Sequence, residues 1–207
     1  MLASITDKKL QKLCSLILNT DRIEHMSKLP VHLEGHHTYR GALLEHTCEV
    51  VTGAYFQIKS TAVVRYMPCS QDLVIAGALL HDVSSTLQIR ESGFGFQMDN
   101  TDRISGGFYK LYGTLEETAR KCGMDTQTFS ALAHIIDTSH IDGKLPMSIE
   151  AMIVRSVNRL SAEMALYEDS FLTENLLYGQ EEAIIYSRGL RRNIIRFKKG
   201  TKDAGKN

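Results

Sequence analysis

A histidine and an aspartate stand side by side at the end of a strongly apolar stretch of the sequence. His81 and Asp82 directly follow residues 73–80, which carry no charge, and His46 lies upstream in the segment LLEHT. An aspartate at the C-terminal end of a buried helix faces the negative end of the helix dipole and loses its solvent, so it needs a compensating cation. Neutral imidazoles and a carboxylate are common ligands of Zn, Fe, Mn and related divalent ions. The three residues therefore predict a metal site.

The elements that must position these residues are predicted to be helices. Strand-like alternation is nearly absent, and the prolines stand where helical patterns would stop. The apolar spacing predicts helices at about residues 6–26, 40–58, 72–82, 107–122, 125–137 and 148–168. The helix of 72–82 is apolar on all sides, which is typical of a helix inside a bundle. We expect an all-α fold, a compact helical bundle with a buried central helix.

Three further details of this helical pattern concern a connection, the helix starts and the last helix. Residues 84–107 are richer in Gly, Asp, Asn and Ser, and we expect them to form an irregular connection of a length that is often functional. Asp125 or Thr126 is expected to cap the helix of 125–137, and Ser148 the last helix. A stripe of small residues on that last helix leaves Asn158 pointing inward.

The length and composition favour one domain with a small appendage. Within the 207 residues we expect a domain at 1–170 and a C-terminal helical extension at 171–207 that ends in a basic, frayed tail. The net charge is formally zero, which argues against strong bulk attraction to nucleic acid or membrane. The four cysteines lie far apart, so we expect reduced thiols and a cytoplasmic protein. Polar residues interrupt each apolar stretch, including the one at the N-terminus, so we expect neither a signal peptide nor a membrane span. Nothing in the composition indicates an oligomeric state.

Two stretches of the sequence carry a family resemblance. HHTYRGALLEHT, residues 36–47, resembles the HHAYxGGLLEHT signature of HD-domain phosphohydrolases, an all-helical, metal-dependent superfamily named for its His-Asp pair. GALLHDV, residues 77–83, resembles the GALLHDI motif of the same branch, which includes bacterial 3′ to 5′ exoribonucleases and the HD modules of some conjugation proteins. Weaker similarity extends this resemblance over roughly residues 10–165.

The resemblance implies a set of site residues. The positions that match the family's metal ligands are His46, His81, Asp82 and Asn158, the last standing where the family usually has an aspartate. His140 is a further ligand candidate, because Ser139-His140 resembles the family's SHHG. His36 and His37 precede the helix of His46, where they would contact a scissile phosphate or hold the loop. Asp82 and His81 are the implied catalytic residues.

Several positions depart from the family pattern. Asn158 brings no negative charge, so it should hold an ion more weakly than an aspartate. Ser85 replaces the lysine of HDIGK, which removes an expected phosphate contact. Phe108 or Tyr109 stands in place of the Gly-His-Ile histidine of two-metal members, and Ile141 in place of the second SHHG histidine. These departures argue against a two-metal site.

The resemblance implies a metal-dependent phosphohydrolase that acts on a nucleotide or oligonucleotide. The ion, whether Mn, Fe, Ni, Zn or Mg, would acidify a bound water and polarise a phosphoryl oxygen, and Asp82 would also orient that water. The expected partner is a phosphate-ester small molecule or a short nucleic acid. One alternative is a degenerate HD module that binds metal, nucleotide or a protein partner without catalysis. Another is an HD-type iron oxygenase, which would need a fuller set of His and Asp ligands.

Overall fold

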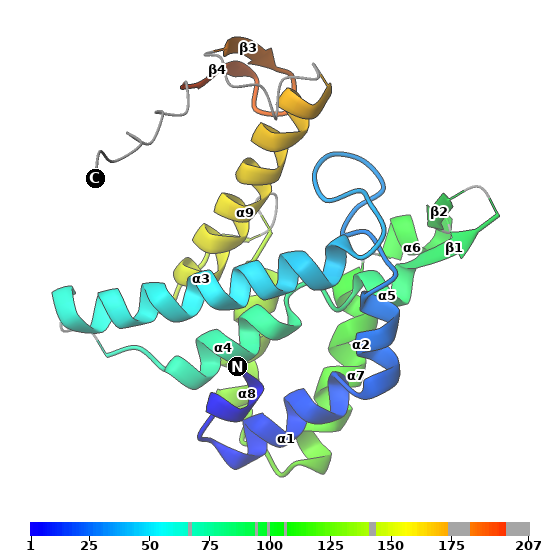
Figure 1. The fold of residues 1–207 in the computed structure, drawn as a ribbon. Coiled ribbons are helices and arrows are strands. Elements are labelled where there is room, and N and C mark those ends of the chain that lie inside the picture. The colour runs from blue at the N-terminus through cyan, green and yellow to red at the C-terminus, as the bar shows by residue number, and fades with distance from the viewer. Residues whose placement is uncertain are drawn as a thin grey trace, which may run out of the picture. The chain divides into compact units, whose positions relative to one another are not determined.

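The structure is a computed structural model that describes residues 1–65, 68–93, 95–98, 100–105, 107–140, 144–173 and 183–197 (Figure 1). Its contacts divide the chain into two units, Met1–Ser161 and Ala162–Asn207, and helix α9 (Ile149–Thr173) contributes to both. The predicted domain boundary at residue 170 stays a prediction. Among the described helices, none combines the length and the apolar character that crossing a bilayer requires.

The first unit is built almost entirely of helices, which confirms the predicted helical bundle. Its elements before α9 are the 3-10 helix η1 (Leu2–Ser4), α1 (Lys8–Ile17), α2 (Thr20–Met26), α3 (Ala42–Arg65), α4 (Gln71–Leu80), α5 (Ser85–Gln88), β1 (Ile89–Ser92), β2 (Gly95–Met98), α6 (Asn100–Ser105), α7 (Gly107–Lys121) and α8 (Thr126–Asp137).

Polar side chains determine where several helices begin. Asp7, Ser70 and Asp125 each accept a hydrogen bond from a backbone N–H group in the first turn of α1, α4 and α8, so the cap predicted at Asp125 is confirmed. Ser148 accepts a similar bond at the start of α9, again as predicted. The single helix predicted over 6–26 is wrong, because Asn19 caps a second helix, α2, within that range.

Helix α4 is the central helix of the first unit and contacts α1, α3 and α8 (Figure 1). Six of its ten residues are buried, as predicted from its uniformly apolar sequence. Gly77 lets α8 approach closely, since a Cβ there would lie 2.3 Å from Cγ2 of Ile135. The residues at the end of α4 are therefore held in the middle of the bundle.

The connection predicted to be irregular over 84–107 contains regular elements instead. It includes α5, α6 and an antiparallel hairpin in which Ile89 of β1 pairs with Met98 of β2. Ile89 is buried, and Phe96 and Met98 pack against the same core. The alternation of these apolar side chains over a few residues produces a strand pattern too short to stand out in the sequence.

The second unit differs from the predicted helical extension. Helix α9 ends at Thr173, and β3 (Ala183–Ser187) pairs antiparallel with β4 (Arg192–Arg196). Paired isoleucines, with Ile184 opposite Ile195 and Ile185 opposite Ile194, favour strands because β-branched side chains pack well on a pleated surface. The last part of the predicted basic tail, residues 198–207, lies outside the described residues.

Candidate metal centre

Three side chains from two elements converge on one buried point. Nε2 of His46, on α3, lies 3.2 Å from Nε2 of His81 and 3.3 Å from Oδ2 of Asp82. Nε2 of His81 lies 3.2 Å from the same carboxylate oxygen. All three residues are at most 2% exposed. The structure thus brings together the three residues on which the predicted metal site depends.

Local backbone structure aims these side chains. Gly41 leads into α3 with a φ of +87°, which a residue with a Cβ rarely adopts, and His46 follows in the second turn of the helix. His81 is the last residue of α4 in helical conformation. Asp82 follows in a tight turn, where its carbonyl accepts a hydrogen bond from the N–H of Ser85 at 3.0 Å. The site therefore lies where a buried helix ends.

The His81 ring has one nitrogen already engaged. Its Nδ1 lies 2.8 Å from the carbonyl oxygen of Ala78, and because a carbonyl only accepts, Nδ1 must carry the proton. The lone pair of the neutral ring is then on Nε2, which points to His46 and Asp82.

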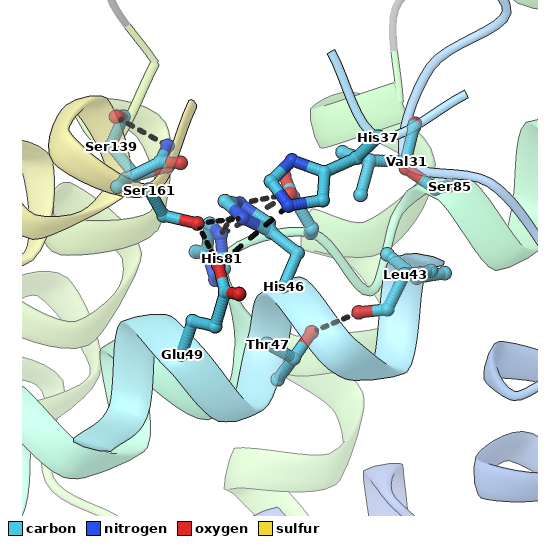
Figure 2. Close-up of polar contacts among 12 residues, drawn as sticks. Val31, His37, Leu43, His46, Thr47, Glu49, His81, Ser85, Ser139 and Ser161 are labelled. Atoms are coloured by element: carbon cyan, nitrogen blue, oxygen red, sulfur yellow. Dashed lines mark hydrogen bonds and ion pairs between the residues drawn. The ribbon is translucent and has the colours of Figure 1, made fainter. Parts of the chain in front are cut away.

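The His46 ring contacts Ser161, which in turn contacts Glu49 (Figure 2). Its Nδ1 lies 2.8 Å from Oγ of Ser161 on α9. The Ser161 hydroxyl donates its only hydrogen to a carboxylate oxygen of Glu49, so Nδ1 of His46 must donate to the hydroxyl oxygen. Its Nε2 therefore presents a lone pair as well. Hydrogen bonds of this kind on the far ring nitrogen are the usual support of metal-bound histidines.

The three converging atoms fit a divalent cation. Two lone pairs and a carboxylate oxygen face one another without a donor between them when both rings are neutral. Ligands bound at about 2.1 Å, with angles of about 90 to 110° between them, lie about 3.0 to 3.4 Å apart. The observed separations of 3.2 to 3.3 Å fall within that range.

Burial and the neighbouring charges shift the pKa values of Asp82 and His81 in opposite directions. Burial acts to raise the pKa of Asp82, but His81, His46 and His140 outweigh it and hold the pKa well below its ordinary value. Burial acts to lower the pKa of His81, yet Asp82 and the Ala78 carbonyl raise it overall. A proton on His81 and a metal ion therefore compete for the same point.

The loop before α3 brings further histidines to the site. His37 is buried with a φ of 53°, its Nε2 lies 3.6 Å from Glu49, and its ring centre lies 4.7 Å from that of His46. His36 contacts His37, with 3.1 Å between their Nδ1 atoms. Burial and the neighbouring histidines lower the pKa of His36 to about 4. Both residues thus lie beside the cluster, where their predicted contact with a phosphate stays a prediction.

His140 contacts the cluster through Asp82, whereas Asn158 is bonded to a backbone carbonyl. Nε2 of His140 lies 3.5 Å from Oδ1 of Asp82, whereas the other two histidines contact Oδ2, and the His140 side chain is 42% exposed. Asn158 is buried on α9, where its amide nitrogen donates to the carbonyl of Ser139 at 3.0 Å. The predicted ligand roles of His140 and Asn158 both stay predictions.

A cavity of about 390 Å³ opens onto the cluster. His81, Asp82 and His140 line it, and its apolar wall includes Val31, Met98, Phe108 and Ile136. Ser85, where the family motif has lysine, is buried and donates to the Val31 carbonyl at 3.3 Å. Phe108 and Tyr109 also line the cavity. That one of them stands in place of the histidine of two-metal members stays a prediction.

Three residues of the site were not predicted. His32 lines the cavity. Burial lowers the pKa of His32 overall, although the nearby carboxylate of Asp82 acts to raise it. Glu49 and Ser161 support His46. The spacing of Glu49, one turn after His46 on the same helix, was a signal that would have found it. His32 and Ser161 reach the site only through tertiary contacts.

One comparison with known proteins finds a relative. The chain is 27% identical over 121 residues to the dihydroneopterin 2′,3′-cyclic phosphate phosphodiesterase of Methanocaldococcus jannaschii, an alignment that covers 52% of this chain and 49% of that protein. The chain thus spans about half the length of this curated relative. No protein-family model and no solved structure matches the chain. The chain is a distant homologue of a phosphodiesterase, and the closer resemblance to exoribonucleases and conjugation proteins gains no support.

Proposed function

We propose that this protein is a metal-dependent phosphohydrolase of the HD type that cleaves a phosphodiester bond. The observation that carries the proposal is the meeting of His46 Nε2, His81 Nε2 and Asp82 Oδ2 at 3.2 to 3.3 Å beside a cavity. The distant homology to a phosphodiesterase supports the same class of reaction.

The residues of the cavity have distinct roles in this proposal. His46, His81 and Asp82 would hold the ion, with Asn158 as a fourth ligand. A divalent ion in this position supplies an acidified water and a polarised phosphoryl oxygen. Oδ1 of Asp82, which is turned toward His140, would accept a hydrogen bond from the attacking water and so orient it. The half-exposed His140 would donate a proton from Nε2 to the leaving oxygen.

The cavity favours a small substrate. A volume of about 390 Å³ suits a molecule of nucleotide size, and its apolar wall suits the face of a planar ring. The relative is named for a cyclic phosphate of dihydroneopterin, which is a phosphate-ester small molecule. We therefore favour a phosphodiester of a ring-bearing small molecule or single nucleotide over a long nucleic acid.

Hydrolysis of a generic phosphodiester tests this function. Bis(p-nitrophenyl) phosphate and a nucleoside 2′,3′-cyclic phosphate would be assayed with Mn, Fe, Ni, Zn or Mg added to metal-free protein. We expect turnover with at least one metal and its loss in His81→Ala, while the exposed His25→Ala serves as the matched control. Turnover that His81→Ala leaves unchanged would contradict the proposal.

A non-catalytic metal-binding or nucleotide-binding module is the second candidate. The observation that favours it is the uncharged Asn158, whose amide is engaged by a backbone carbonyl, together with a buried serine where a phosphate-binding lysine was expected. This candidate predicts bound metal without turnover of any phosphoester, so the assay above separates the two.

A further inference from the structure

A positively charged side chain that has no role in the proposed reaction lines the cavity. Among the described residues that line it, Lys144 is the one whose side chain keeps a fixed positive charge near neutral pH. The same lining carries the carboxyl groups of Asp82 and Asp137. An anionic phosphoester that enters beside these carboxylates needs positive charge on the protein in addition to the ion.

The backbone of Lys144 is fastened to the neighbouring helices. Arg155, on α9, donates from Nη1 to the carbonyl oxygen of Lys144 at 2.8 Å and to that of Thr138 at 3.4 Å. The N–H of Met147 donates to Nε2 of His134, on α8, at 2.9 Å. These bonds hold the segment against the end of α8, so the lysine has a defined place at the cavity.

The side chain of Lys144 is held by an exchangeable partner. Its Nζ lies 2.9 Å from Oδ2 of Asp137, the last residue of α8. The hydrogen bond and the charge of Asp137 raise the pKa of Lys144, which keeps it protonated. The lysine side chain is 79% exposed, and ion pairs with so much solvent around them are weak. A phosphate group, with more acceptor oxygens, competes well for the ammonium.

We propose that Lys144 is a phosphate-binding residue of this cavity, which leaves Asp137 to pair with a phosphoryl oxygen of the substrate. This inference rests on the proposed phosphohydrolase function and names the group that recognises the substrate's charge. It places the positive charge on the segment after α8, whereas the family motif would have it at position 85, where the structure has a buried serine bonded to Val31. Asp137 then acts as an internal competitor that holds the lysine in place between substrates.

Two substitutions with opposite expected effects test the proposal. The probe is inorganic phosphate, titrated calorimetrically into the metal-loaded protein. Lys144→Gln is expected to weaken phosphate binding about ten-fold, the usual effect of losing one charge-assisted hydrogen bond. Asp137→Asn is expected to tighten it several-fold, because the lysine is released. The double variant should match Lys144→Gln. Lys121→Gln is the control, since Lys121 pairs with Glu117 on the exposed face of α7.

Opposite effects of the two substitutions on phosphate affinity would distinguish a phosphate-binding Lys144 from an ion pair that only holds the fold. If the ion pair served only to hold the fold, both single variants would weaken binding alike, and that result would overturn the proposal. Equal phosphate affinity in all variants would overturn it too. If the wild-type protein hydrolyses no phosphoester while the opposite effects on phosphate binding are found, the proposed function fails and the phosphate site stands. Normal turnover with an unchanged KM in Lys144→Gln would leave the function standing and reject the role of Lys144.

Discussion

The Nε2 atoms of His46 and His81 face each other across 3.2 Å in the interior of the bundle. Each ring has its Nδ1 engaged elsewhere, His46 with Ser161 and His81 with a backbone carbonyl. With the carboxylate of Asp82 beside them, the two nitrogens leave a place that either a proton or a metal ion must occupy. The behaviour of the protein should therefore depend on which of the two is present.

Metal binding is expected to stabilise the fold. An ion at one hundred times its dissociation constant adds about 2.7 kcal/mol to the free energy of unfolding, which corresponds to a rise in Tm of roughly 5 to 10 °C for a chain of this size. Differential scanning fluorimetry with Mn, Fe, Ni or Zn added to chelator-treated protein measures the rise. His81→Ala should lose it and His25→Ala should keep it; an equal rise in both would place the ion elsewhere.

The metal-free and metal-loaded proteins should respond to pH in opposite ways. In the metal-free protein, the raised pKa of His81 stabilises the fold below the ordinary value of 6.5, and this contribution is lost as the pH rises through the folded pKa. The lowered pKa of Asp82 stabilises the fold above 3.8, and its contribution is lost only as the pH falls through the folded pKa. The pair thus contributes most between pH 3.8 and 6.5.

With metal present, the same histidine must release its proton before it can bind the ion. The stabilisation by metal should therefore grow as the pH rises from 5 to 8, while the metal-free protein loses the His81 contribution. Urea denaturation across this range, with and without metal, measures both curves. Parallel curves would show that metal and proton do not compete at His81.

Ser161 is expected to act on metal affinity through His46. Ser161→Ala removes the acceptor for the Nδ1 proton of His46 and the link to Glu49. Losses of such supporting hydrogen bonds weaken metal binding about 10 to 100-fold. Competition with a fluorescent chelator measures the change. Ser156→Ala, at an exposed position of α9, is the matched control and should bind like the wild type.

Asn158→Asp tests the predicted fourth ligand. If Asn158 binds the ion, the added charge should tighten metal affinity. At the same time the metal-free variant should lose about 1 to 3 kcal/mol of stability, because the hydrogen bond to the Ser139 carbonyl is replaced by a buried carboxylate beside an acceptor. Chelator competition and urea denaturation give the two values. A metal affinity equal to that of the wild type would place Asn158 outside the ligand set.

Close approach of α4 and α8 should make Gly77 sensitive to substitution. Gly77→Ala places a Cβ 2.3 Å from Cγ2 of Ile135, and such overpacking costs about 1 to 3 kcal/mol. Gly113→Ala, on the exposed side of α7 with no atom near its added Cβ, should instead stabilise by about 0.5 to 1 kcal/mol. Urea denaturation compares them, and a loss of stability of the same size in both would contradict the packing argument.

The parts of the fold that the sequence predicted are those with local signals. The uniformly apolar residues of α4 indicated a central helix, and a His-Asp pair at its end indicated a buried charge that needs a cation. The cap at Asp125 was equally local. The two hairpins were missed, because each strand has only four or five residues and the pattern of Ile89, Phe96 and Met98 is visible only once the strands are paired.

The surroundings of the candidate metal centre depend on tertiary contacts that no local pattern of the sequence reveals. Ser161 meets His46 across 115 positions of the sequence, and no pattern within α9 distinguishes it from its neighbours. Lys144 stands in a connection between two helices and reaches the cavity because Arg155 and Asp137 hold it there. The candidate ligands were therefore visible in a local motif. The residues that orient their side chains were not, because they come from distant parts of the sequence.

Metal content is the most direct test of the central claim. After incubation with excess divalent metal and gel filtration, elemental analysis should find one ion per chain in the wild type and in His25→Ala. His46→Ala, His81→Ala and Asp82→Ala should retain far less, provided that circular dichroism shows the helices intact. Equal metal content in the wild type and these three variants, or no metal in the wild type, would contradict the assignment of a metal centre to these side chains.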